Sequence, residues 1–452
     1  MKAKYLIGAA LSLWIPANTA TAAERPVGIE KIQHIVVLYM ENRSFDNLYG
    51  LFPGANGLSN AESAAIQLDS DGKPYATLPA VIHTAHGKPS ETDARFPSNL
   101  PNKPFDIGRY VPIDQNTGDL VHHFYQNQMQ INGGKNNNFV NVSNAGALTM
   151  GYYDGRDLPL WKYASQYTLA DNFFQGAFGG SFLNHLWLIC ACTPTYPNAP
   201  KKMRAILDKN GKLLKDGALT PDGYAVNTIQ PYYMPHKLSV KDSRKTLPPQ
   251  THATIGERLS EKNIDWAWYA GGWNDALSGW PAPSFKFHHQ PFVYFSKYAD
   301  GSQAKAQHLK DESDFIKAIN EGKLPPVSFY KPIGIHDEHP GYADIVTGEK
   351  HIAEIIDSIQ RSPMWKNTAI IVTYDENGGF WDQAAPPKGD RWGPGTRIPT
   401  IVISPFAKRG YVDHTLYNTT SILKFIETRF DLKPLGERDA KANGLLGAFD
   451  FK

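Results

Sequence analysis

The segment Ile32–Asp46 reads IQHIVVLYMENRSFD, and the interpretation of the whole chain starts from it. Its apolar centre, Ile35–Leu38, is short, rich in β-branched residues and bounded by polar ones, which predicts a strand buried on both faces of a parallel sheet. Ligand sites of open α/β sheets gather just beyond the carboxyl ends of strands. Glu41 and Asn42 follow this strand and are therefore candidate ligands of a hard cation. The alternative is a helix start, with Asn42 or Ser44 as its capping residue.

A second buried strand with acids at its end lies far along the chain. Thr368–Tyr374 reads TAIIVTY and is followed by Asp375, Glu376, Asn377 and two glycines. Adjacent acids repel each other unless a cation lies between them or one of them holds a proton, and the two glycines allow the backbone to turn away sharply. Two strands that both deliver oxygen ligands at their carboxyl ends predict one shared divalent metal ion.

Several short motifs, well separated in the sequence, are similar to those of a known protein family. They are ENRSFD at 41–46, FGGSFLN at 178–184, FHHQPF at 287–292, EHPG at 338–341 and YDENGG at 374–379. Together they resemble the bacterial phosphoesterase family of phospholipases C and secreted acid phosphatases. VHHFYQ, INGGK and FHHQPF resemble the acid phosphatase branch more closely. The resemblance implies an α/β fold, an alkaline-phosphatase-like sandwich with a mostly parallel central sheet, helices on both faces and a loop-rich inserted lobe.

Ser181 is the candidate nucleophile. It follows a Gly-Gly turn and opens an apolar helix, whose first N–H groups favour an incoming phosphate. The alternative is that Ser181 only caps that helix, but the serine matches the nucleophile position of the family. The resemblance implies one divalent metal, of open identity, in contact with Ser181 and held by the four residues at the two strand ends, namely Glu41, Asn42, Asp375 and Glu376.

The resemblance also assigns residues to the phosphate and the leaving group. Four histidines are expected to hold phosphate oxygens or to protonate the leaving group, and a lysine and an asparagine to bind substrate; they are His122, His288, His289, His339, Lys135 and Asn184. An ordinary surface lysine is the alternative for Lys135. Gln383 receives no role, because the family usually has Asp-His where this chain has Asp-Gln. The roles of four further histidines stay open: His123, His185, His336 and His414.

The sequence also predicts an N-terminal signal and the bounds of the catalytic domain. Residues 1–22 combine a lysine-bearing start, an apolar stretch and a small-residue cleavage pattern, which predicts a signal peptide and a periplasmic or secreted product. No later stretch is long and apolar enough to predict a transmembrane anchor. We expect residues 23–452 to form the catalytic domain, with loop-rich insertions at about 51–112 and 195–250.

Composition adds two expectations. Lys plus Arg total 46 against 44 for Asp plus Glu, so charge gives no reason to expect a nucleic acid partner. The chain has two cysteines, Cys190 and Cys192. On a strand they would lie near the upper distance limit for a disulfide, so two small buried thiols are expected rather than a strained bridge.

The function expected from these observations is that of an acid phosphatase, which hydrolyses small phosphomonoesters through a phosphoserine. If the histidines must be protonated to hold phosphate, activity should peak on the acidic side of neutral. One alternative is a phospholipase C that cleaves phosphatidylcholine and needs an apolar surface or an aromatic cage for the head group. Another is a secreted binding protein that is stabilised by metal and is not catalytic; it would scatter the motif residues over the surface.

Overall fold

The computed structural model describes residues 26–61, 65–85 and 89–452. The expected signal peptide, residues 1–22, lies outside the described residues. Among the helices of the described segments, none has the length and apolar character that crossing a membrane requires.

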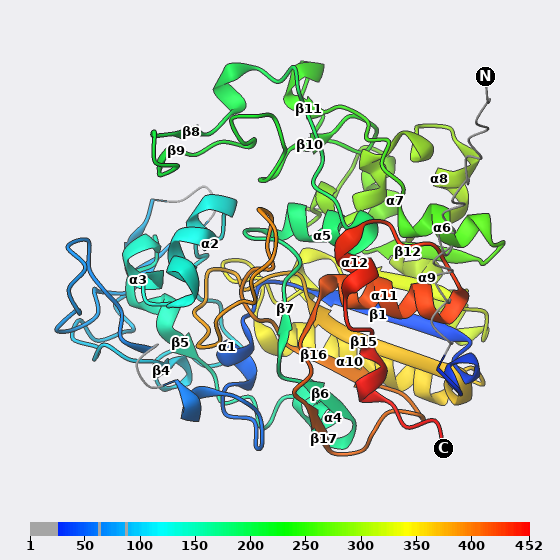
Figure 1. Cartoon of the computed structure of the whole chain (residues 1–452), viewed down its shortest axis with the longest axis horizontal. Coiled ribbons are helices and arrows are strands. Elements are labelled where there is room, and N and C mark those ends of the chain that lie inside the picture. The colour runs from blue at the N-terminus through cyan, green and yellow to red at the C-terminus, as the bar shows by residue number, and fades with distance from the viewer. Residues whose placement is uncertain (1–25, 62–64, 86–88) are drawn as a thin grey trace, which may run out of the picture.

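An eight-stranded sheet forms the centre of the molecule (Figure 1). Its strands lie side by side in the order β13 (Leu309–Asp311), β12 (Trp266–Ala270), β14 (Val327–Lys331), β1 (His34–Met40), β15 (Thr368–Tyr374), β16 (Thr400–Ile403), β6 (Thr168–Ala170) and β17 (Tyr411–Asp413). The first five pair in parallel, and β17 is parallel to β6. Only β16 runs in the opposite direction within this sheet.

The predicted strands are found, and their register explains the site. β1 and β15 are immediate neighbours and pair in parallel from His34 with Thr368 to Met40 with Tyr374. Both are buried along almost their whole length, as their continuous apolar runs require. Because the last residues of the two strands are partners, the polar residues that follow them emerge side by side at one edge of the sheet.

Helices cover both faces of the sheet. On one face pack α5 (Ser181–Cys190), α6 (Ile255–Glu261) and α11 (Thr419–Phe430), and on the other α4 (Pro159–Gln166), α9 (Glu312–Asn320) and α10 (Ile345–Arg361) (Figure 1). In α10 the side chain of Asp344 caps the first turn, and a row of buried isoleucines faces the sheet. This arrangement confirms the expected α/β fold with a mostly parallel sheet between two helical layers.

The remaining elements are short. The helices are α1 (Phe45–Tyr49), α2 (Phe124–Ile131), α3 (Phe139–Val142), α7 (Trp273–Leu277), α8 (Gln303–His308) and α12 (Glu437–Lys441). The strands outside the main sheet are β2 (Ile82–His83), β3 (Glu91–Thr92), β4 (Phe105–Asp106), β5 (Gly151–Tyr152), β7 (Phe173–Phe174), β8 (Ile206–Leu207), β9 (Leu213–Lys215), β10 (Gln230–Pro231), β11 (Thr246–Leu247) and β18 (Tyr417–Asn418).

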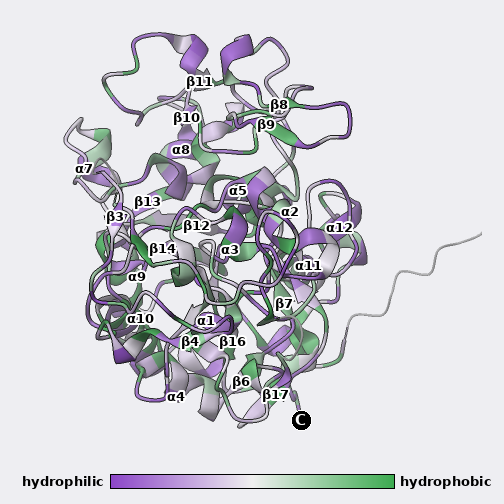
Figure 2. Ribbon diagram, turned by 90° about the vertical axis from the view of Figure 1, so that its left-hand side faces the viewer, coloured by the Kyte–Doolittle hydropathy of each residue, from purple (hydrophilic) through white to green (hydrophobic). Residues whose placement is uncertain are grey.

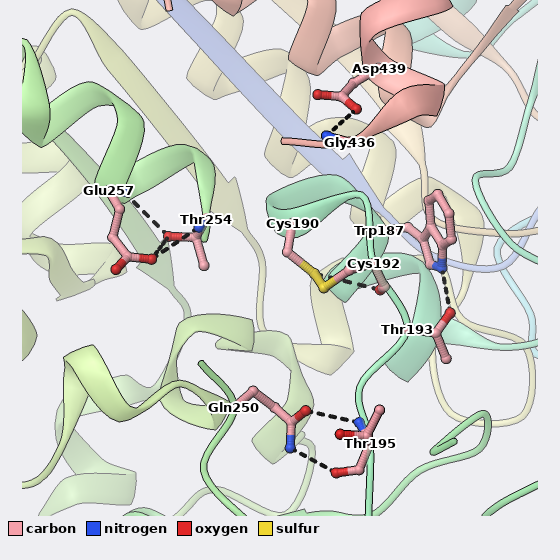
Figure 3. Close-up of a disulfide and its surroundings, with 10 residues drawn as sticks. All are labelled: Trp187, Cys190, Cys192, Thr193, Thr195, Gln250, Thr254, Glu257, Gly436 and Asp439. Carbon is pink, nitrogen blue, oxygen red and sulfur yellow. Dashed lines mark hydrogen bonds between the residues drawn. A yellow bond between two sulfur atoms is a disulfide. The ribbon is translucent and has the colours of Figure 1, made fainter. Parts of the chain in front are cut away.

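The segment 195–250, here called the excursion, carries β8 to β11 and stands at one end of the molecule (Figures 1 and 2). Its first and last residues are joined at the base. The side-chain amide of Gln250 accepts a hydrogen bond from the N–H of Thr195 and donates one to its carbonyl, at 2.9 and 3.0 Å (Figure 3). The excursion is therefore a loop closed at its root.

A disulfide bridge lies next to this root, between Cys190 and Cys192 (Figure 3). The expectation of two free thiols was wrong, because it assumed a strand. Helix α5 ends at Cys190, and Ala191 takes a left-handed conformation with φ of 47°. This turn brings the two Cα atoms to 5.1 Å, well within the range that a disulfide spans.

Candidate active site

Side chains from β1, β15 and α5 converge at the carboxyl edge of the sheet. The hydroxyl of Ser181 lies 3.4 Å from Glu41 Oε2, 3.4 Å from Asn42 Oδ1 and 3.5 Å from Glu376 Oε1. Asp375 stands beside them, since its Oδ1 accepts from the N–H of Asn42 at 3.2 Å. All four expected ligands and the expected nucleophile are buried together at one point.

The backbone after β15 turns away as the glycine pair predicts. Gly378 has φ of 60°, and a Cβ placed there would lie 2.4 Å from the carbonyl oxygen of Asn42. The turn also brings the N–H of Gly378 to Oε2 of Glu376, which it donates to at 2.5 Å. The glycine therefore allows the two ligand-bearing segments to touch.

The turn before Ser181 is equally tight. Gly179 has φ of 85°, and a Cβ on it would come within 2.5 Å of the backbone nitrogen of Phe124. Asn184, expected to bind substrate, holds this turn instead. Its amide accepts from the N–H of Ala177 at 2.8 Å and donates to the carbonyls of Gly179 and Gly180. Because the side chain is fully buried and faces this backbone, Asn184 is a positioning residue.

The four predicted histidines form two groups in the site. His288 and His289 lie with His185, whose ring stacks on that of His289 at 5.2 Å, and Nε2 of His289 is 2.7 Å from Glu41 Oε1. His122 and His339 form the other group, with ring centroids 5.7 Å apart. Nε2 of His122 lies 3.5 Å from Glu376 Oε1.

Burial makes most of these imidazoles weak bases. It lowers the pKa of His289 to about 4, and it lowers the pKa of His288 and of His339 below the ordinary value. In the protein alone these rings are neutral near pH 7. These histidines would therefore take up protons, as an acidic optimum of activity requires, only when the negative charge of a bound phosphate raises their pKa.

Two residues that the sequence reasoning missed organise Glu41. Lys331, the last residue of β14, is fully buried, and its Nζ lies 2.8 Å from Glu41 Oε1. The carbonyl of Asp337 accepts from the N–H of Glu41 at 2.9 Å. Burial opposes the charged form of Glu41, yet Lys331 and His289 lower the pKa of this carboxyl well below its usual range. The signal for Lys331 is its place at the end of β14, the strand that pairs with β1.

A cavity of about 610 Å³ opens above Ser181. Its walls carry the two histidine groups, Lys286, Tyr342 and part of the excursion, including Asp216 and Asn227. His123 lies at the rim and pairs with Asp216, Nδ1 to Oδ2 at 2.7 Å. The N–H of Phe124 donates to Asn227 Oδ1 at 3.1 Å, so the start of α2 and the excursion are fastened together.

Other predicted residues lie elsewhere. Lys135 is exposed and is not among the residues that line the cavity, so its contact with substrate stays a prediction without support from the geometry. A Cβ on the preceding residue, Gly134, would lie 3.4 Å from Cβ of Ala385. Gln383, which received no role, donates to Asn56 and lies outside the site. His414 precedes β18 and pairs with Asp171 at 2.8 Å.

The donor set fits a divalent cation. Three carboxylates and an amide oxygen are the ligands that hard cations prefer. Asp375 Oδ2 is buried and makes no hydrogen bond. Burial, and after it the charge of Glu41, raises the pKa of Asp375, and burial likewise raises that of Glu376. Carboxylates in such a setting are stabilised by a cation between them.

A comparison with protein families matches residues 32–433 to the Phosphoesterase family. The chain belongs to this family. The family and the site, a serine among carboxylate and amide oxygens, both indicate hydrolysis of phosphoric ester bonds. The protein is therefore a hydrolase of this class. The match includes all the convergent residues described above.

Curated relatives of this phosphoesterase include two bacterial phospholipases C. Phospholipase C B of Mycobacterium tuberculosis is 26% identical over 472 residues, which cover 94% of this chain and 79% of the relative. The hemolytic phospholipase C of Pseudomonas aeruginosa is 26% identical over 475 residues, which cover 94% of this chain and 56% of that protein.

Solved structures similar to this phosphoesterase include a protein in the alkaline phosphatase superfamily from Vibrio parahaemolyticus. It has a TM-score of 0.36 and 10% identity, with 64% of each chain covered. The lipoteichoic acid synthase LtaP of Listeria monocytogenes has a TM-score of 0.31 and 9% identity, with 85% of this chain and 82% of that chain covered. The fold assignment rests on the sheet described above rather than on scores of this size.

Proposed function

We propose that the protein is an exported, metal-dependent phosphatase that hydrolyses phosphomonoesters through a phosphoserine at Ser181. The observation that carries the proposal is the position of the Ser181 hydroxyl. It lies among three oxygen ligands at 3.4–3.5 Å and at the floor of a cavity walled by histidines. The sequence pattern of residues 1–22 supports export.

Glu41, Asn42, Asp375 and Glu376 would hold one divalent cation, which when bound stabilises negative charge on the serine oxygen and on the phosphate. The all-oxygen donor set favours Mg²⁺, Ca²⁺ or Mn²⁺ over softer ions. Independently of the ion, Ser181 is the first residue of α5, so the N–H groups at the start of that helix face an incoming phosphate.

The first half of the reaction forms the phosphoserine. The Ser181 proton passes to Glu376, whose Oε1 lies 3.5 Å away and whose pKa is raised by burial, while the serine oxygen attacks phosphorus. The bond from phosphorus to the ester oxygen breaks, and the departing oxygen takes a proton from the group of His122 and His339. His288 and His289, the other group, hold nonbridging oxygens of the phosphate.

The second half releases phosphate. Water gives a proton to the histidine that lost one and attacks phosphorus, and the bond to Ser181 breaks. The serine oxygen recovers its proton from the neighbouring carboxyl group. Both residues then return to their starting state, so each turnover consumes one ester and one water.

Two cavity residues beside the histidines, Lys286 and Tyr342, favour a small, doubly charged phosphate group. Nζ of Lys286 lies 4.2 Å from the ring centroid of Tyr342, and both residues line the cavity. This ammonium covers the ring face that a choline head group would need. It also adds a positive charge, which suits a phosphomonoester better than a phosphodiester that bears one charge.

Phospholipase C activity is the second candidate. The similarity to two phospholipases C over 94% of the chain favours it. Asp119 and Asp216 on the cavity wall offer negative charge to a cationic head group. A metal-stabilised binding protein without activity is a weaker candidate, because the motif residues converge on one serine rather than scattering over the surface.

Hydrolysis by the purified protein tests the proposal. We expect turnover of p-nitrophenyl phosphate and little release of phosphocholine from phosphatidylcholine vesicles. Protein quenched in acid during turnover should contain a phosphorylated peptide with Ser181. Replacing Ser181 by Ala should lower kcat by several orders of magnitude with a smaller change in KM. Near-normal turnover of Ser181→Ala would overturn the serine mechanism in favour of direct attack by water.

Lys286→Met separates the two substrate classes. A charged hydrogen bond is worth about 1.5–3 kcal/mol, so we expect kcat/KM for the monoester to fall by about 10–100-fold. Activity on phosphatidylcholine should stay equal or rise, since the ring of Tyr342 becomes free. An unchanged monoester activity, or a preference of the wild type for phosphatidylcholine, would favour the second candidate.

A further inference from the structure

A second group of metal-type ligands lies behind the active site, on the other side of β14. Successive residues of a strand face opposite sides of the sheet. Lys331 faces Glu41 in the active site, whereas Tyr330 turns to His351 of helix α10, with its hydroxyl 2.6 Å from Nε2. His336, in the turn after β14, and Glu312, the first residue of α9, complete the group.

The side chains of this group are close together and partly buried. Glu312, His336 and His351 each bring one ligand atom within 4.8 Å of the other two. Nε2 of His351 lies 3.6 Å from Glu312 Oε1, and the two imidazole rings stack at 4.4 Å. Three different elements, α9, α10 and the turn after β14, therefore contribute one ligand each.

One buried nitrogen of the group, Nδ1 of His336, makes no hydrogen bond. Tyr330 satisfies Nε2 of His351, but Nδ1 of His336 is shielded from solvent and has no hydrogen-bond partner. A buried nitrogen left unpaired is costly unless something binds it. A cation between the two imidazoles and the carboxylate would supply that partner.

We propose that Glu312, His336 and His351 bind a transition metal ion such as Zn²⁺, at a second site distinct from the active site. Two imidazoles and one carboxylate are a common zinc ligand set, and nitrogen ligands select such ions over Mg²⁺ and Ca²⁺. Zinc bonds of about 2.0–2.2 Å require the ligand atoms to move closer, which side-chain rotation allows. Tyr330 or water completes the coordination.

The protonation of the ligands agrees with metal binding. Burial lowers the pKa of His351 to about 4, and it lowers the pKa of His336 as well. Both rings are therefore neutral at pH 7, which is the state that binds metals.

The ion at this second site would brace the active site from behind. The turn that carries His336 continues to Asp337, whose carbonyl accepts from Glu41, and to His339 of the cavity wall. Tying this turn to α9 and α10 would fix both residues. The proposal does not depend on the reaction, because the ligands lie outside the cavity.

Metal stoichiometry tests the proposal. The wild-type protein, stripped with chelator and dialysed against submicromolar Zn²⁺, should retain zinc that His336→Ala and His351→Ala lose, by about one equivalent per chain. Asp375→Asn, which weakens only the active-site metal, should keep it. His83→Ala is the matched control, because His83 also pairs with a carboxylate, Asp93, at 3.8 Å, far from α9 and α10.

Cobalt provides a readout without activity. Co²⁺ bound by two imidazoles and a carboxylate absorbs visible light, and this absorption should be present in the wild type and in Asp375→Asn but absent in His336→Ala. His336→Asn serves as a second variant if His336→Ala does not fold, as judged by circular dichroism. Equal zinc content and equal cobalt spectra in wild type and folded His336 variants would overturn the proposal and show adventitious binding only.

Discussion

At the scale of single residues, the site depends on cations that compensate the negative charge of buried carboxylates. Glu41 is surrounded by acids, and Lys331 is the nearest cation, fully buried at 2.8 Å. A buried ion pair is sensitive to the loss of one partner, because the other charge then stays in the interior without compensation. A divalent ion held by Glu41 would take over part of this compensation.

Lys331→Met should therefore destabilise the metal-free protein by about 3–5 kcal/mol, and the metal-loaded protein by less. Denaturant unfolding in chelator and in millimolar Mg²⁺ or Mn²⁺ measures both values. Lys286→Met is the control, because it removes the same charge from the cavity wall, where solvent screens it. Equal losses with and without metal would show that Lys331 does not share Glu41 with an ion.

The residue scale also shows what motifs can and cannot predict. Glu41, Asn42, Ser181, Asp375 and Glu376 were correctly placed together, because each follows a strand or opens a helix at the same sheet edge. The contact of Lys135 with substrate stays a prediction, since one cation after two glycines says nothing about which way the turn faces. The sequence also could not reveal that Asn184 positions the turn before Ser181. An asparagine whose amide hydrogen-bonds to the backbone cannot be told in sequence from one that hydrogen-bonds to substrate.

At the scale of elements, the turn after β15 can be tested directly. Gly378→Ala forces a side chain into a left-handed backbone and against the carbonyl of Asn42. We expect metal affinity and kcat to fall by at least tenfold with the overall fold retained, as measured by metal titration and circular dichroism. Gly72→Ala is the control, with φ of 76° but no atom within 4 Å of the new Cβ. Normal metal affinity in Gly378→Ala would mean that the two segments can separate without loss.

The root of the excursion gives a second prediction at this scale. Gln250→Leu removes both hydrogen bonds to Thr195 and leaves that backbone without partners in a part-buried position. We expect faster cleavage by trypsin at the lysines between 201 and 245, and a raised KM, because the excursion forms part of the cavity wall. Gln307→Leu, on the exposed side of α8, should leave the cleavage pattern unchanged. Identical digestion of wild type and Gln250→Leu would rule out the root as a restraint.

Elements were predictable where the sequence pattern was long. Strands β1 and β15 were predicted from their continuous apolar runs. The three-residue strands β6, β13 and β17 were missed, because so short a segment has no measurable period.

At the scale of the whole molecule, the C-terminal packing adds a pH dependence of stability. Glu427 of α11 is 3% exposed and faces Asp439 of α12. Burial, followed by its interaction with Asp439, raises the pKa of Glu427 to about 9, against a partial opposing effect of Lys424. The folded state thus binds a proton that the unfolded state releases above about pH 4.5. Stability from this group is present below that pH and is lost as pH rises toward 9.

Glu427→Gln should therefore flatten the decline in the free energy of unfolding between pH 5.5 and 8.5. As the pH rises, the free energy of unfolding of the variant should increase relative to that of the wild type by up to about 1.4 kcal/mol per pH unit. Denaturant unfolding at several pH values measures it. Glu437→Gln, an exposed change on α12, is the control. Parallel curves for wild type and Glu427→Gln would contradict the raised pKa.

The pairing of β1 with β15 has a consequence for the timing of assembly. Asn42 and Asp375 touch although 333 residues separate them. During synthesis Glu41 and Asn42 emerge long before Asp375 and Glu376. Closing so long a loop is a late and slow step. A chain that has not yet reached Asp375 lacks two of the four proposed ligands, so metal capture would follow the pairing of β1 with β15. Bound metal per chain would then report the fraction of molecules in which these strands have paired.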